Sequence, residues 1–145
     1  MFTSILAPYD GSRNGERALR KAAELARLCE AEMTILTVYR HRAMLEGSLS
    51  MVRQDDPGPL DAAMRDYGRE VAEHGKSIAA EAGMAETRAF VRSGAPARTI
   101  VAFAAEHGHD VIVLGSRGLG SIEDYLLGSV SHKVTGLAEC PVLVV

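Results

Sequence analysis

Glycine and serine residues cluster between positions 115 and 129 in a pattern that can hold a phosphate chain. The segment is G-S-R-G-L-G-S-I-E-D-Y-L-L-G-S, so two residues separate Gly115 from Gly118 and nine separate Gly118 from Gly128. Gly115 follows an apolar run, where a residue without a Cβ atom lets backbone amides approach a ligand. Gly128 and Ser129 precede a helical segment whose first N–H groups favour an anion. The pattern indicates a phosphate site, with glycines that serve tight turns alone as the alternative.

Other phosphate-binding motifs do not fit this segment. The stretch from Gly128 lacks the second glycine before Lys133 that a P-loop requires, and residues 115–120 do not match the dinucleotide-binding fingerprint. A P-loop nucleotide hydrolase and a Rossmann dehydrogenase are therefore both disfavoured.

Side chains in the glycine segment offer little for catalysis. Glu123 and Asp124 could hold a metal ion through water, or they could be solvated charges. Arg117 could pair with phosphate or point to solvent. The Ser129 hydroxyl could cap the following helix, donate to phosphate, or do both. Whether the protein is an enzyme stays open, and weak nucleotide hydrolysis is the most that these residues support.

Alternating apolar runs and amphipathic segments predict the elements that position this site. Strands are expected where apolar or β-branched residues form short runs, at 4–8, 33–39, 86–92, 110–114 and 141–145. Helices, with Asp61 as a possible cap and Pro96 in a first helical position, are expected at 13–29, 61–82, 96–108 and 129–137. The 40–60 segment is expected to be a long loop, either a lid or a mobile insert. This order predicts one α/β domain over residues 1–145, a doubly wound parallel sheet with helices on both faces.

The composition restricts the class of protein. The 145 residues carry 16 basic and 19 acidic side chains, a net charge of -3, so no overall attraction to nucleic acid or to a membrane is expected. Cys29 and Cys140 lack metal or disulfide spacing and are expected to be core thiols, while His132 and Lys133 are expected to be surface or packing residues. No apolar run approaches the ~20 residues that cross a bilayer, so a cytoplasmic protein is expected. Five basic residues fall at helical spacing: Arg13, Arg17, Arg20, Lys21 and Arg27. They are expected to form a solvated face of a helix, with a face that docks phosphate or RNA as the alternative.

Together these segments resemble the universal stress protein family, whose ATP-binding members carry G-x2-G-x9-G-[ST] at this place. The resemblance extends to the opening I-L-A-P-Y-D-G-S, the G-A-P before the third helix, the D-V-I-V-L-G-S-R-G strand and loop, and the closing C-P-V-L-V-V. It implies a five-stranded parallel sheet in the order 3-2-1-4-5. In that order the loops after the first and fourth strands meet at one crevice, where ligands of α/β proteins bind.

The resemblance also implies roles for single residues. Asp10 is expected to accept hydrogen bonds from the ribose hydroxyls, with a turn-forming or helix-capping role as the alternative. Pro8 and Val38 would line the adenine pocket, which the backbone around Leu114 and Gly115 would complete. The phosphates, with a Mg or Mn ion held mainly by their oxygens, would be surrounded by Ser116, Arg117, Gly118, Gly128, Ser129 and Val130.

The function expected from this resemblance is a regulatory or stress-response role in which bound ATP changes conformation or assembly. The alternatives are an ATP-using enzyme such as a slow hydrolase, and an interaction protein that does not need ATP. The apolar residues 141–145 would form an exposed sheet edge in a monomer. The resemblance implies that this strand pairs with its copy in an antiparallel homodimer.

Overall fold

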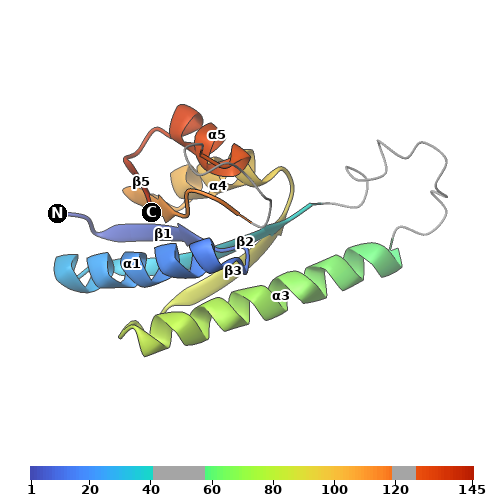
Figure 1. The fold of residues 1–145 in the computed structure, drawn as a ribbon, viewed down its shortest axis with the longest axis horizontal. Helices are drawn as coiled ribbons and strands as arrows, with labels where there is room; N and C mark the ends of the chain where they lie inside the picture. Colours follow the sequence, from blue (N-terminus) through green and yellow to red (C-terminus); the bar gives the residue numbers. More distant parts are fainter. Residues whose placement is uncertain (41–57, 119–126) are drawn as a thin grey trace.

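Strands and helices alternate along the chain in the computed structural model, which describes residues 1–40, 58–118 and 127–145 (Figure 1). In chain order the elements are β1 Ser4–Pro8, α1 Arg13–Cys29, β2 Glu32–Tyr39, α3 Gly58–Glu81, β3 Arg88–Ser93, α4 Pro96–Glu106, β4 Val111–Leu114, α5 Ser129–Leu137 and β5 Val142–Val144. The predicted alternation is confirmed. Residues 41–57, most of the predicted long loop, lie outside the described residues.

Three predicted boundaries are wrong by two or three residues, and several others differ by one. Helix α3 begins at Gly58, so Asp61 lies in its first turn instead of capping it; a proline at position 59 fits a first helical turn. Strand β3 begins at Arg88 instead of residue 86, because both the N–H and the hydroxyl of Thr87 donate to the Met84 carbonyl in a turn. Helix α4 stops at Glu106, and Gly108 follows with φ 68°.

The five strands form a parallel sheet in the order β3-β2-β1-β4-β5, as predicted. Ile5 of β1 pairs with Met33 of β2 on one side and Val111 of β4 on the other. Chain connections therefore leave the β1–β4 pair in opposite directions, and the carboxyl ends of these two strands diverge into a crevice.

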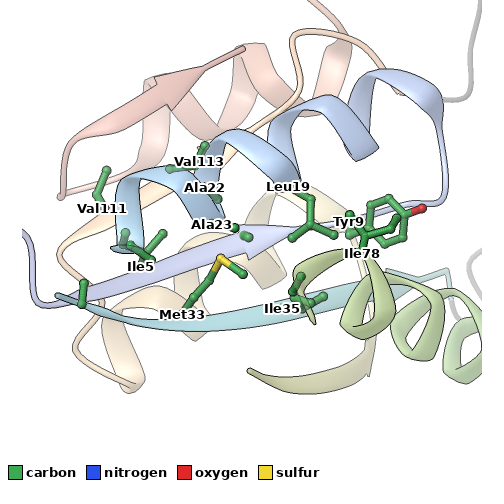
Figure 2. Packing of buried hydrophobic residues seen from close by; sticks show 14 of the residues in the cluster. Ile5, Tyr9, Leu19, Ala22, Ala23, Met33, Ile35, Ile78, Val111 and Val113 are labelled. Atoms are coloured by element: carbon green, nitrogen blue, oxygen red, sulfur yellow. The ribbon is translucent and has the colours of Figure 1, made fainter. Parts of the chain in front are cut away.

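Two hydrophobic clusters hold helices against the two faces of the sheet (Figure 1). One contains α1 and α3 residues packed on Ile5, Met33 and Ile35, and Figure 2 shows this packing from close by. The other joins α4 and α5 through residues such as Ile100 and Val134. The doubly wound α/β fold is thus confirmed.

The structure also shows how far the basic residues of α1, the two cysteines and the longer helices meet the expectations from the sequence. The five basic residues of α1 are all exposed, which agrees with a solvated helix face. The prediction that Cys29 and Cys140 are core thiols is wrong in detail, because both are free but only half-buried, one at the margin of each hydrophobic cluster. Within the three described ranges, no helix is long and apolar enough to cross a membrane.

Candidate functional site

A cavity of about 420 Å³ lies where the carboxyl ends of β1, β2 and β4 meet the start of α5. All the residues predicted to bind nucleotide line it, except Ser116: Pro8, Asp10, Val38, Leu114, Gly115, Arg117, Gly118, Gly128, Ser129 and Val130. The structure therefore brings together two segments that lie more than 100 residues apart in the sequence. The topology produces this meeting, because β1 and β4 are neighbours in the sheet.

The Asp10 carboxylate forms a turn after β1 and also faces the cavity. Its Oδ1 accepts a hydrogen bond from the Ser12 N–H at 2.9 Å. Ser12 caps α1 by accepting from the Gly15 N–H at 3.0 Å, so Asp10 is a turn-former but not the helix cap. A Cβ atom on Gly118 would lie 2.7 Å from Asp10 Oδ2. The second carboxylate oxygen thus meets the glycine loop across the cavity.

Asn14 in the first turn of α1 fixes the loop that follows β4. Its Oδ1 accepts from the Arg117 N–H at 2.7 Å and from the Ser116 hydroxyl at 3.4 Å, and its Nδ2 donates to the Val145 carbonyl at 3.4 Å. A Cβ atom on Gly115 would lie 2.6 Å from Asn14 Oδ1. This close approach explains why position 115 requires glycine in this arrangement.

The Ser116 backbone ties the glycine loop to the end of the chain and to α5. Its N–H donates to the Val145 carbonyl at 2.8 Å, and its carbonyl accepts from the Gly128 N–H at 2.6 Å and from the Ser131 hydroxyl at 2.9 Å. Ser116 therefore stands behind the cavity wall in this structure. A contact between Ser116 and phosphate stays a prediction.

The start of α5 packs directly against the glycine loop. Gly128 is the N-cap residue, and no side chain caps the helix, so the predicted capping role of Ser129 is wrong. A Cβ atom on Gly128 would lie 3.2 Å from the Ser116 carbonyl oxygen and 3.3 Å from Arg117 Cα. Exposed Ser129 stands at the cavity, beside first-turn N–H groups that lack partners within a helix. This end of the cavity suits an anion.

The cavity lining is divided between apolar and basic side chains. Its apolar members include Leu36, Val38 and Ile100, which suit a flat heterocycle. Among the described lining residues, Arg40 and Arg117 are basic and Asp10 is the acidic one, so the local charge favours an anionic ligand.

Tyr9 also lines the cavity, and its phenol is held neutral. Burial raises the pKa of Tyr9, and the nearby carboxylates of Glu16 and Asp10 raise it further. The hydroxyl lies 3.0 Å from Nδ1 of His74 on α3. Tyr9 therefore supports the floor of the site as an uncharged side chain that joins β1 to α3.

Among the described residues, no cluster of histidine, cysteine or carboxylate side chains could hold a metal ion. Glu123 and Asp124, the candidates for holding one through water, lie outside the described residues.

The model of the universal stress protein family matches residues 1–145 of this chain. The chain belongs to the universal stress protein family. Universal stress protein YxiE of Bacillus subtilis is 36% identical over 148 aligned residues, which cover 100% of this chain and 99% of YxiE. The resemblance inferred from the glycine segment and the strand sequences is thus confirmed at the level of the family.

Solved structures of universal stress proteins include nucleotide complexes. A universal stress protein in complex with cAMP has 25% identity and a TM-score of 0.76, and the match covers 99% of this chain and 97% of that one. A universal stress protein from Archaeoglobus fulgidus in complex with dAMP has 25% identity and a TM-score of 0.66, with the same coverage. Members similar in structure to this chain therefore bind nucleotides.

Several residues that line the cavity of this universal stress protein were not predicted from its sequence. Arg40, which directly follows β2, could have been found, because the carboxyl ends of parallel strands meet at one edge of the sheet. Pro96 and Ile100 belong to the start of α4, which packs beside α5. No sequence pattern indicated a role for Asn14, because its hydrogen-bond partners are the backbone N–H of Arg117 and the backbone carbonyl of Val145, far away in the sequence.

Proposed function

We propose that this universal stress protein binds ATP in the cavity between β1, β4 and α5 and acts as a nucleotide-dependent regulator. The observation that carries the proposal is that the Asp10 turn, the loop residues 115–118 and the start of α5 meet at one cavity. Each segment suits a different part of a nucleotide, and the topology of the sheet joins them.

The nucleoside end of ATP is assigned to the carboxyl ends of β1 and β2. Pro8 and Val38, with Leu36 beside them, supply apolar surface for adenine. Asp10 Oδ1 serves the turn, which leaves Oδ2 as the oxygen that we assign to the ribose hydroxyls.

The phosphate end is assigned to Gly115, Gly118 and the start of α5. A Cβ atom on Gly128 would be in tight contact with the Ser116 carbonyl, so glycine here keeps the start of α5 close to the loop that follows β4. The first-turn N–H groups of α5 beside Ser129 are the main-chain donors that we assign to phosphate oxygens. Arg117 and Arg40 add positive charge at the lining. A Mg or Mn ion would be held mainly by phosphate oxygens, where it would neutralise part of their charge.

A regulatory role fits the described lining better than a catalytic one. Asp10 is the one carboxylate among the described lining residues; its Oδ1 accepts from the Ser12 N–H, and we assign its Oδ2 to the ribose hydroxyls and not to the activation of a water molecule. Weak ATP hydrolysis is the alternative function. We place the protein in the cytoplasm as a homodimer, in which bound ATP alters conformation or assembly.

Substitution of Gly128 tests the assignment of the phosphate end. In Gly128→Glu the new side chain would be tight against Ser116 and Arg117 and would bring a carboxylate beside Ser129, so we expect steric crowding and like-charge repulsion to lower ATP affinity by about tenfold or more. Affinity is measured by isothermal titration with MgATP, and folding is checked by thermal unfolding. Leu28→Glu adds the same charge on α1, where the side chain is 77% exposed, and should bind ATP normally. Equal ATP affinity for both variants and the unchanged protein would refute the assignment.

A further inference from the structure

A second hollow, of about 450 Å³, adjoins the nucleotide cavity on the face of the sheet covered by α4 and α5. The two hollows share the lining residues Arg40, Pro96, Ser129 and Val130. The second one continues between α4 and α5 as far as Leu137. We call this hollow the basic groove, because of the side chains that line it: Arg40, Arg98, His132 and Lys133.

No carboxylate side chain is found among the described residues that line the basic groove. Arg40, Arg98 and Lys133 are exposed, and within residues 1–40, 58–118 and 127–145 none of them forms an ion pair. On α1, by contrast, Arg20 and Lys21 each lie within 3.1 Å of a glutamate carboxylate oxygen. Among the described residues, no carboxylate therefore neutralises the positive charge of the basic groove.

The basic groove begins at the place where the proposed phosphate site ends. Ser129 lies at the start of α5 and Lys133 four residues later, about 6 Å farther along the helix axis. Arg98 faces the same hollow from α4. A chain of phosphates that passes Ser129 would thus meet further positive charges without leaving the protein surface.

We propose that the basic groove binds an anionic extension of the nucleotide, so that the protein prefers adenosine polyphosphates longer than ATP. This inference rests on the proposed ATP site. Lysine and arginine side chains that face phosphate oxygens form charge-assisted hydrogen bonds with them. The groove is short and ends at Gly136 and Leu137, and the net charge of the whole chain is -3. These features suit one small anionic group better than a nucleic acid strand.

The test compares two ligands on the full chain. MgATP and the magnesium complex of adenosine 5′-tetraphosphate are titrated calorimetrically into the unchanged protein and into the double variant Arg98→Ala/Lys133→Ala. The unchanged protein should bind the tetraphosphate about fivefold more tightly than ATP, and the double variant should lose that ratio. The ratio is the readout, because loss of distant positive charge lowers both affinities together.

The matched control is the double variant Arg69→Ala/Lys76→Ala on α3. It removes the same two positive charges on the opposite face of the sheet, where they form only exposed ion pairs with Asp66 and Glu73. The control should keep the fivefold ratio. Equal ratios in all three proteins, or no preference for the tetraphosphate, would overturn the inference while leaving the ATP site intact. If neither ligand binds the unchanged protein, the proposed function fails first, and the inference falls with it.

Discussion

Asn14 is the residue that connects the two halves of the candidate site. Its side-chain oxygen accepts from the Arg117 N–H in the glycine loop, and its amide nitrogen donates to the Val145 carbonyl at the end of the chain. The same oxygen stands 2.6 Å from the place that a Cβ atom on Gly115 would occupy. A single side chain on α1 thus sets the position of backbone amides that we assign to phosphate.

Replacement of Asn14 by alanine tests this positioning role. Asn14→Ala should lower the free energy of unfolding by about 1 kcal/mol, because the half-buried Arg117 N–H loses its acceptor. The Arg117 amide should exchange its hydrogen faster, and ATP affinity should fall as the loop loosens. Urea unfolding and hydrogen exchange measure the first two effects. Asn14→Asp keeps an acceptor oxygen and should restore stability. Unchanged exchange at Arg117 in Asn14→Ala would contradict the role.

Strand β5 is one of the two edge strands of the sheet, and it carries an exposed apolar residue. It pairs with β4 on one side only and stands at the edge of the sheet. Leu143 at its centre is 40% exposed, and an apolar edge strand of this kind tends to pair with another strand. The predicted homodimer would cover this edge with the β5 strand of a second copy.

Introducing a charged side chain on β5 tests the proposed dimer and leaves the backbone of the nucleotide site in place. Deletion of the strand would remove the Val145 carbonyl, which accepts hydrogen bonds from Ser116 and Asn14, so a substitution is the better experiment. Leu143→Lys should convert the dimer to a monomer, because lysine on an edge strand opposes pairing. Light scattering after size-exclusion chromatography measures the mass. Leu28→Lys on exposed α1 should stay dimeric. A dimer that persists in Leu143→Lys would exclude pairing through this edge.

Element types were predictable from the sequence because their signals are local. The apolar run before Gly115 became the fully buried strand β4, and the periodic apolar residues of 13–29 became one face of α1. Boundaries were less predictable where a tertiary or turn contact decides them. The turn at Thr87 is one such case, and the choice of Gly128 instead of Ser129 as the α5 cap is another.

At the scale of the whole molecule, the site results from the order of strands in the sheet. Residue types and spacing alone indicated a phosphate loop, and the family resemblance supplied the neighbouring β1 and β4 that bring Asp10 to it. Contacts of Asn14 and the adjoining basic groove could not be predicted in this way. These contacts depend on how α1, α4 and α5 pack against the sheet, and no local sequence pattern predicts that packing.

Binding of ATP in this one cavity can be tested by an amide spectrum recorded during titration. With ¹⁵N-labelled protein and MgATP, saturable shifts are expected at Gly115, Gly118, Ser129 and Val130, which line the cavity. Gly83 and Gly108 are remote from it and should not move. Saturable shifts that are confined to the cavity would support ATP binding at this site. No saturable shift, or shifts centred on another surface, would contradict it.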